Sequence, residues 1–234
     1  LVDGPVDKRI LEYIKKIDKF IYGCDLTVMK YPINKGLGKI LNIGIKEAKN
    51  ELILRCDSDD FSNKNRVKFM YEAYLKNKKI SVIDSGMAEH DGKFTYIRHF
   101  DSLKKNKKFN LKLRNCINHP TTLLKRKDIL KVGNYEHVPF FEDYFLWIKL
   151  LMKNYKFNTV SKVLVETFID INFYKRRSGK NYLKYYKFFL KKCLKIRFIN
   201  IFEFYILYLM RFFFVMNNLK IIIFFYKQFM RKKN

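Results

Sequence analysis

The chain of 234 residues is long enough for one sizeable hydrophobic core, or for one core with an appendage. Hydrophobic residues make up 48% of it and aromatic residues 17%, which excludes an intrinsically disordered protein. The formal net charge of +27 favours a polyanionic partner such as nucleic acid, an anionic lipid surface or a phosphorylated substrate, and a compositional bias towards Lys is the alternative source of that charge.

The first third of the chain predicts alternating strands and helices. Val2-Asp3 is typical of a strand end, and apolar residues recur at helical spacing over residues 6–20. Further elements are predicted at 26–29 (strand), 51–56 (strand) and 65–75 (helix), and a helix is predicted to follow the loop at 34–38 and to run to about residue 48. This order predicts an α/β fold with a Rossmann-type, mostly parallel sheet flanked by helices. Because the chain opens without Met, on what resembles a strand already under way, we also expect an amino-terminal strand to be missing.

The pattern changes after the strand predicted at residues 80–87. Asp91-Gly92 between two strand-like runs predicts a hairpin, and residues 101–118 read as polar and irregular. A strand is expected at 121–124, an amphipathic helix at 141–152 and a strand at 156–168. Two or three helices rich in Phe, Tyr, Ile and Lys are expected from residue 181 to the end.

Three carboxylates follow the strand predicted at residues 51–56. Asp57 and Asp59 are two residues apart, so both side chains leave the same face of an extended chain. Carboxylates crowded at the end of a buried strand are costly unless a cation neutralises them, and hard oxygen ligands suit Mg²⁺ or Mn²⁺. The turn therefore predicts a divalent metal site at Asp57 and Asp59, with a solvated acidic turn as the alternative.

Two further segments are expected beside this turn, because open α/β sheets bind ligands beyond the carboxyl ends of their strands. Asp3 can accept hydrogen bonds from a nucleobase or ribose, although a simple turn explains it equally well. The small-residue loop at Asn34, Gly36 and Gly38 lets the backbone approach a ligand closely. That loop matches neither a P-loop nor the dinucleotide fingerprint, and a loop with a helix cap is its simpler explanation.

Two basic side chains are candidates for phosphate contacts. Arg66, one helical turn into the segment after the acids, can face phosphates, and pairing with nearby acids is the commoner role. His119, in the Asn118-His119-Pro120-Thr121 loop, can touch a metal, a diphosphate or a sugar, and a structural role is the alternative. Arg176-Arg177 can likewise close over phosphates or simply begin the basic tail.

Glu142 and Asp143 open the helix predicted at 141–152. Acids at a helix amino terminus complement its dipole by about 0.3–1 kcal/mol, which is a sufficient structural reason for them. The functional interpretation is a general base, and the aromatic surroundings of these acids would raise a carboxylate pKa towards that task.

Residues 179–234 are expected to form a basic, aromatic helical extension of a catalytic domain at residues 1–178. Residues 171–234 contain 16 Lys and Arg against one acid, Glu203, giving +15. Four charged residues interrupt the aromatic tail, so we expect no membrane-spanning helix. Basic amphipathic helices lie in anionic membrane interfaces, and we favour that surface over nucleic acid.

Several of these segments, in this order, resemble family 2 glycosyltransferases of the GT-A fold, closest to the bacterial enzymes of O-antigen, capsule and amylovoran-type exopolysaccharide synthesis. The resemblance covers about residues 1–178 and is carried by Val2-Asp3-Gly4-Pro5, Asn34-Lys35-Gly36-Leu37-Gly38-Lys39-Ile40-Leu41-Asn42, Asp57-Ser58-Asp59-Asp60 with Arg66, Asn118-His119-Pro120-Thr121 and Glu142-Asp143-Tyr144-Phe145-Leu146-Trp147.

The resemblance implies an inverting, metal-dependent hexosyltransferase that uses a nucleotide sugar, commonly UDP-linked, with Mn²⁺ or Mg²⁺. It implies that Asp3 contacts the nucleoside, Asp57 the ribose or donor sugar and Asp59 the metal, and that Asp143, with Glu142, is the base. The implied acceptor is a lipid-diphosphate-linked saccharide, with the enzyme cytoplasmic and peripheral at the inner face of the cell membrane. Two alternatives stay open: a sugar-nucleotide nucleotidyltransferase, and a non-enzymatic module that binds membranes or nucleic acid.

Overall fold

The computed structural model describes residues 1–17, 23, 25–98, 107–229 and 232–233. Its strands are β1 (Val2–Asp3), β2 (Lys30–Tyr31), β3 (Leu52–Leu54), β4 (Phe61–Ser62), β5 (Ile80–His90), β6 (Thr95–Arg98), β7 (Leu123–Lys125), β8 (Lys156–Phe168) and β9 (Lys232–Lys233). Its helices are α1 (Lys8–Ile17), α2 (Leu37–Glu47), α3 (Arg66–Lys76), α4 (Lys107–Leu113), α5 (Arg126–Lys131), α6 (Glu142–Met152), α7 (Ile171–Lys175), α8 (Gly179–Lys195), α9 (Ile201–Val215) and α10 (Leu219–Phe229), with a 3-10 turn at His119–Thr121.

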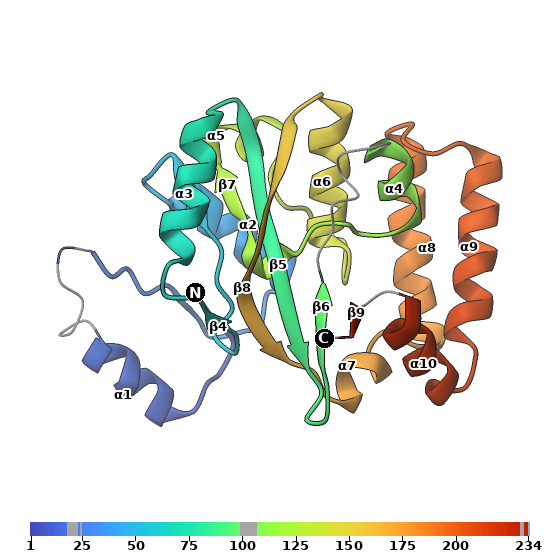
Figure 1. Ribbon diagram of the computed structural model, residues 1–234, viewed down its shortest axis with the longest axis horizontal. Coiled ribbons are helices and arrows are strands. Elements are labelled where there is room, and N and C mark those ends of the chain that lie inside the picture. The colour runs from blue at the N-terminus through green and yellow to red at the C-terminus, as the bar shows by residue number, and fades with distance from the viewer. Residues whose placement is uncertain (18–22, 24, 99–106, 230–231, 234) are drawn as a thin grey trace.

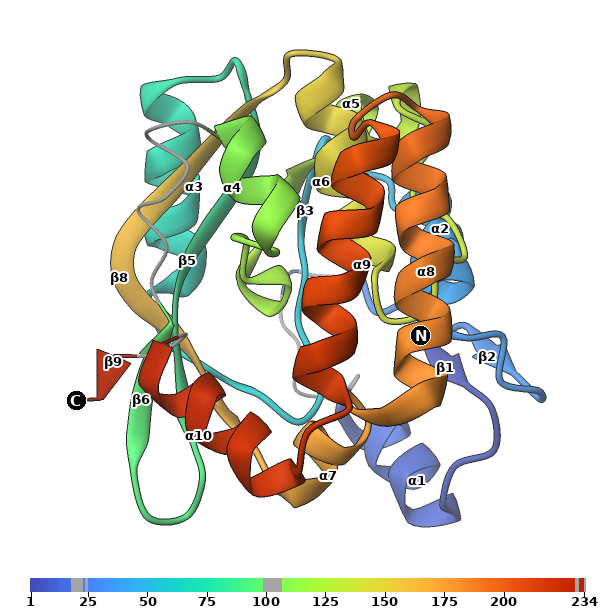
Figure 2. The same ribbon diagram turned by 90° about the vertical axis from the view of Figure 1, so that its right-hand side faces the viewer.

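Long strands β5 and β8 form the centre of the molecule. They pair in parallel along most of their length, and their ribbons cross the middle of Figure 1. α3 lies on one side of them, and α6, α8 and α9 follow one another outward on the other side (Figures 1 and 2). β5 is buried along both faces, as expected for a strand covered by helices on each side.

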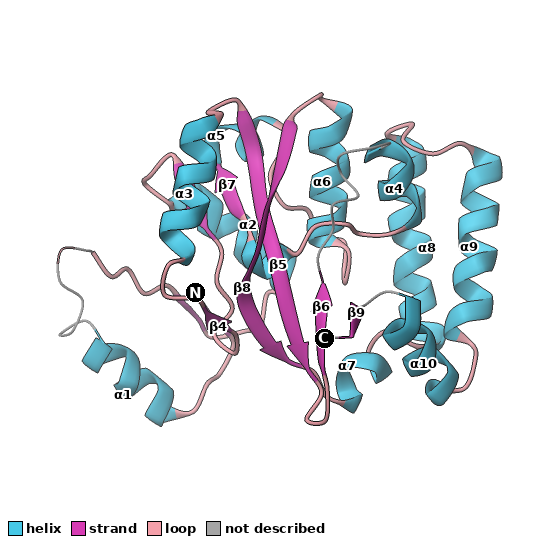
Figure 3. Ribbon diagram, viewed as in Figure 1, coloured by secondary structure: helices cyan, strands magenta, loops and turns pink. Residues whose placement is uncertain are grey.

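The α/β fold with flanking helices is confirmed, but the sheet is mixed and the expectation of mostly parallel pairing is wrong. β7 inserts between β3 and β5 and is antiparallel to both, while β6 returns antiparallel to β5 through the predicted hairpin (Figure 3). β3, β5 and β8 still run in one direction, as the alternation of strands and helices required. The reversed neighbour, β7, comes from a segment some 70 residues after β3, so local sequence pattern did not reveal its place.

β1 and β2 form a separate two-stranded parallel sheet. A cavity of about 1230 Å³ lies between this small sheet and β3, with Leu1 and Met29 on one side and Ile53 and Leu54 on the other. The strand expected at 26–29 is observed at Lys30–Tyr31, and the end of the helix expected at 6–20 lies outside the described residues.

The main hydrophobic core joins residues before position 179 to the carboxyl-terminal helices. One cluster of buried side chains contains Trp147 of α6, Tyr186 and Phe189 of α8 and Phe204 of α9. Phe141 stacks on Phe189 with ring centroids 4.8 Å apart. The core is therefore continuous across residues 178 and 179, and the division of the chain at that point stays a prediction. None of the described helices is long and apolar enough to span a bilayer.

Candidate functional site

A cavity of about 690 Å³ opens where the segment after β3 and the ends of β5 and β8 meet the start of α6. Two groups of acids line it, the turn of Asp57, Asp59 and Asp60 and the pair Glu142 and Asp143. Its other charged lining residues are Glu89 and six arginines: Arg55, Arg98, Arg114, Arg176, Arg177 and Arg211. The acidic turn, His119 and the Glu142-Asp143 pair thus converge on one chamber that carries both charges, whereas Asp3, Asn34, Gly36, Gly38 and Arg66 are not among its lining residues.

The acidic turn is organised by an arginine that the sequence interpretation missed. Arg55 makes a bidentate ion pair with Asp57 at 2.6 and 2.7 Å. Asp59 is exposed and has no protein partner in the described part of the chain. Burial, together with repulsion from Asp57 and Asp59, raises the pKa of Asp60 against the opposing hydrogen bond from Thr167. The three neighbouring carboxylates therefore differ in their surroundings, since Asp57 is ion-paired, Asp59 is exposed and Asp60 is partly buried.

The oxygens of this turn fit a hard divalent cation that also binds substrate. Asp60 Oδ2 is buried without a hydrogen-bond partner among the described residues, and Asp59 lies free on the cavity wall. No cluster of three or more His, Cys, Asp and Glu side chains able to hold a metal occurs in the described segments. A cation here would accordingly complete its shell with substrate phosphate oxygens and water, which is the usual arrangement for Mg²⁺.

The loop after β2 is tied to the end of β1. Asp3 accepts hydrogen bonds from the backbone N–H groups of Lys35 (2.7 Å) and Gly36 (3.1 Å). Asn34 Oδ1 accepts a further bond from Gly36 N–H at 2.9 Å, and Gly36 has a φ of 84°, which favours glycine. These contacts bring Asp3, Asn34 and Gly36 together at the amino terminus of α2, while Leu37 of that helix lines the cavity itself.

Glu142 joins α6 to α2. Its side chain is only 7% exposed and accepts a hydrogen bond from the backbone N–H of Gly38, at the positive end of the α2 dipole. Burial, helped by repulsion from Asp143, nevertheless raises the pKa of Glu142 to about 7. A Cβ atom at Gly38 would lie 2.7 Å from Glu142 Cγ and 2.7 Å from the Glu136 carbonyl oxygen, so only glycine allows this approach.

Asp143 is the less enclosed acid of the pair. Asn115 Nδ2 donates to its Oδ2 at 2.7 Å, and His119 Nδ1 lies 3.9 Å from the same oxygen. Burial is the main cause that raises the pKa of Asp143, and the bonds from Tyr144 N–H and Asn115 oppose it. A desolvated carboxylate held by a neutral amide is a stronger base than an exposed one.

His119 is buried behind Asp143. Its Nε2 lies 2.8 Å from the Tyr135 hydroxyl, and its ring meets Trp147 edge-on with centroids 5.7 Å apart. Burial, with the nearby positive charge of Arg55, lowers the pKa of His119 well below its usual value, so the imidazole is neutral at neutral pH. His119 lines the cavity, and its edge towards Asp143 can orient that carboxylate.

Arg66 lies beneath the cavity and does not line it. Its side chain is 2% exposed, and its terminal nitrogens donate to the carbonyl oxygens of Arg55 (2.6 Å) and Pro120 (2.7 Å) and to Ser62 Oγ (2.8 Å). These bonds tie the end of β3 to the His119 loop. Protein oxygens thus engage both terminal nitrogens of Arg66, and a contact of this residue with phosphate stays a prediction.

Other supporting groups gave no signal in the sequence. Asp84 on β5 accepts hydrogen bonds from Thr159 Oγ1 (2.7 Å) and Asn118 N–H (3.2 Å), and burial raises its pKa to about 7. Phe140, before the acid pair, has a φ of 69°, rare for a bulky residue, and lines the cavity half-exposed. Asn115 follows helix α4, where residues 101–118 had been expected to be irregular; residues 101–106 of that stretch lie outside the described residues.

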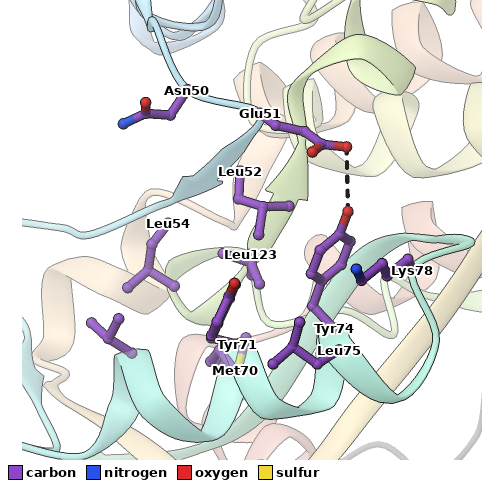
Figure 4. A pocket seen from close by; sticks show the side chains of 11 residues that line it. Asn50, Glu51, Leu52, Leu54, Met70, Tyr71, Tyr74, Leu75, Lys78 and Leu123 are labelled. Carbon is purple, nitrogen blue, oxygen red and sulfur yellow. Dashed lines mark hydrogen bonds between the residues drawn. The ribbon is translucent and has the colours of Figure 1, made fainter.

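Another cavity, of about 520 Å³, lies between β3 and α3 (Figure 4). Leu52, Leu54, Met70 and Tyr71 form most of its wall, and its one carboxylate, Glu51, accepts a hydrogen bond from Tyr74 Oη at 3.3 Å. It therefore lacks the paired acids that line the cavity of about 690 Å³.

Comparison with known proteins identifies the family of the chain. The sequence profile of Glycosyl transferase family 2 matches residues 1–133. The chain is 30% identical over 183 residues to the UDP-Gal:alpha-D-GlcNAc-diphosphoundecaprenol beta-1,3-galactosyltransferase of Escherichia coli, covering 77% of this chain and 65% of that protein. It is 23% identical over 184 residues to the amylovoran biosynthesis glycosyltransferase AmsE of Erwinia amylovora, covering 78% and 68%.

A solved structure shares the fold. The mannosyltransferase PcManGT of Pyrobaculum calidifontis, solved with GDP-Man and Mn²⁺, superposes with a TM-score of 0.59 and 13% identity, covering 83% of this chain and 54% of that one. The chain thus spans less than two thirds of the E. coli relative and about half of this structural neighbour.

Proposed function

The chain belongs to glycosyl transferase family 2, and from this premise we propose that it transfers a sugar, with inversion, from a nucleotide-activated donor to a hydroxyl group of a lipid-linked saccharide. The observation that carries the proposal is the meeting of the Asp57–Asp60 turn and the Glu142-Asp143 pair in one cavity. Similarity to the E. coli galactosyltransferase, which is named for a UDP-linked donor and a diphosphoundecaprenol-linked acceptor, supports a UDP-sugar and a lipid-diphosphate acceptor in surface polysaccharide synthesis.

Asp143 acts as the base. Its carboxylate takes the proton of the acceptor hydroxyl while that oxygen forms a bond to the anomeric carbon. The bond between this carbon and the diphosphate oxygen breaks on the opposite face, so the configuration inverts and the nucleoside diphosphate leaves with the electron pair. Asn115 and neutral His119 hold the carboxylate in position, and Glu142 fixes the start of α6 against α2.

The donor lies across the ends of β1 and β3. Asp3 with the loop of Asn34 and Gly36 holds the nucleoside, and Asp57 faces the ribose or donor sugar. Asp59 and Asp57 would hold Mn²⁺ or Mg²⁺, and the bound cation would neutralise charge on the diphosphate leaving group. Arg66 supports this side from beneath through Arg55 and Pro120.

A donor-binding and product assay tests the proposal. Thermal-shift measurements with a panel of nucleotide sugars, with and without Mn²⁺, should show metal-dependent stabilisation that Asp59→Ala removes. Release of free nucleoside diphosphate supports sugar transfer, whereas release of pyrophosphate would identify a nucleotidyltransferase. Salt-sensitive binding to nucleic acid or vesicles as the sole activity, unchanged in Asp59→Ala, would refute catalysis.

A further inference from the structure

Helix α9 presents an apolar face that no described part of the chain covers. Its uncovered side chains recur at positions i, i+3, i+4, i+7, i+8 and i+11, and they are Phe202, Tyr205, Ile206, Leu209, Met210 and Phe213. Each is between 50% and 76% exposed. We refer to these six residues as the α9 face. Scattered exposed apolar residues are ordinary, whereas a continuous stripe marks an interaction surface.

The position of the helix explains why this face is open. α9 is the outermost of the layers α6, α8 and α9 in Figure 1, and it lies towards the viewer in Figure 2. Its opposite side supplies Phe204, Leu207 and Val215 to the core. The two charges of α9 also avoid the open face, because Glu203 pairs with Lys112 and Arg211 lines the cavity. The face thus carries no charged side chain over about 17 Å of helix.

The surroundings of the face are strongly basic. Neighbouring α8 carries five exposed lysines, Lys180, Lys184, Lys187, Lys191 and Lys195, and Lys187 Nζ reaches over the ring of Tyr208 on α9 at 5.6 Å. An apolar stripe bordered by lysines complements an anionic bilayer, whose acyl chains accept the aromatic side chains while its head groups attract the cations. A second copy of the chain would instead bring another +27 against this surface.

We propose that the α9 face docks the protein on an anionic lipid bilayer, with α9 lying flat in the interface. Arg211 ties the same helix to the cavity, so the docked bilayer surface lies about one helix diameter, ~10 Å, from the chamber. The inference deepens the proposed function, because a lipid-linked acceptor would then reach the cavity without leaving the membrane. Bilayer docking itself needs neither donor nor acceptor and can be measured alone.

Vesicle sedimentation tests the inference. The wild-type chain should bind phosphatidylcholine vesicles that contain phosphatidylglycerol, in a salt-sensitive manner, and bind pure phosphatidylcholine weakly. Phe202→Ser with Phe213→Ser should reduce binding at least about tenfold. Tyr13→Ser with Phe109→Ser, which removes equally exposed aromatics from α1 and α4, should leave it unchanged. Equal binding by both double variants, or no binding by the wild type, overturns the inference.

A tryptophan introduced on the α9 face reports whether that face enters the bilayer, and it keeps an aromatic side chain at the substituted position. The one tryptophan, Trp147, is fully buried, so its fluorescence monitors folding of every variant. Tyr205→Trp should shift its emission to shorter wavelength on vesicles and be quenched by brominated lipid, whereas Tyr13→Trp should not. A dimer in solution that Phe202→Ser with Phe213→Ser dissociates would overturn the inference in favour of self-association. Sugar transfer to a lipid-free acceptor should survive in that variant, so failed docking and failed catalysis remain distinguishable.

Discussion

The carboxylates of the cavity differ because their partners differ. Asp57 faces the guanidinium of Arg55 at 2.6 Å, whereas Asp143 is held by the neutral amide of Asn115. An ion-paired carboxylate holds its charge and makes a weak base, while a desolvated one with a raised pKa gains basicity. The two halves of the chamber are thereby suited to different tasks, charge binding at the turn after β3 and proton transfer at the start of α6.

Asp143→Asn should remove proton transfer and leave donor binding intact. Because an amide cannot take up the proton, we expect kcat to fall by about 10²–10⁴. Asparagine has nearly the same volume as aspartate and can still bond to Asn115, so the donor dissociation constant should not change. Because the pKa of Asp143 is raised and the ionised form is the base, the wild-type rate should rise with pH on the acid side. Initial rates and donor titrations measure both quantities, with Asp7→Asn as a surface control. Normal turnover in Asp143→Asn would exclude this base.

Asp84→Asn should alter how stability depends on pH. The pKa of Asp84 is about 7 in the folded chain against 3.8 unfolded, so between pH 4 and pH 7 the native state binds more protons. Stability conferred by the neutral form is present at low pH and lost as pH rises, by on the order of 4 kcal/mol. Asparagine stays neutral, can donate to Thr159 Oγ1 and can accept from Asn118 N–H.

In urea unfolding the variant should therefore match the wild type near about pH 3, below the unfolded pKa of Asp84, and exceed it near pH 8. The difference between the two proteins is the quantity to follow, because Glu142 titrates in the same range in both. Parallel stability curves would mean that Asp84 ionises normally.

At the scale of elements, the site depends on how closely α2 approaches α6. Gly38 and Gly44 lie in the same helix, which permits a matched pair of substitutions. A Cβ at position 38 would meet a carbonyl oxygen and Glu142 Cγ at 2.7 Å, whereas at position 44 it would meet only the flexible end of Leu1 at 2.8 Å. Only the first contact forces the two helices apart.

Gly38→Ala should lower the free energy of unfolding by about 1–3 kcal/mol, because the helices must separate. It should also reduce turnover, because Glu142 and Asp143 move with α6. Gly44→Ala should be neutral, or stabilise by up to ~1 kcal/mol through helix propensity. Denaturant unfolding measures the stability of both variants, and initial rates measure their turnover. Equal effects at the two positions would show that the α2–α6 contact is not limiting.

The sequence predicted the elements whose pattern is local. Periodic apolar residues predicted α2, α3 and α6 to within a residue or two, and the bounds of β8 agree. Helix α4 escaped notice because it is short and basic, and burial of Leu111 is what anchors it. The place of β7 and the pairing of Asn115 with Asp143 depend on contacts between distant segments, which no local pattern encodes. The spacing of Asp57 and Asp59 predicted that both acids belong to the site. The ion pair of Asp57 with Arg55, two residues before it, was not predicted.

For the whole molecule, the carboxyl-terminal helices are part of the core. Tyr182, Tyr186 and Phe189 of α8 contact Phe141, and Phe189 also contacts Tyr144. Helix α10 contributes much less: Ile222, in a small cluster with Ile169 and Tyr174, is its one fully buried side chain among those described. Removing α8 should therefore destabilise the chain much more than removing α10.

A chain cut after Ser178 should fail to fold cooperatively. Each large apolar side chain removed with α8 is worth about 1.5–3 kcal/mol, and α8 supplies five buried ones besides Cys193, so their sum reaches the ~5–15 kcal/mol that stabilises a typical domain. A chain cut after Asn218 loses α10 and the two-residue strand β9, and should remain folded. Gel filtration and Trp147 fluorescence compare the two, since Trp147 lies in the core that α8 covers. A soluble, cooperatively unfolding chain of residues 1–178 would instead mean that the aromatic helices dock onto a catalytic unit already stable without them.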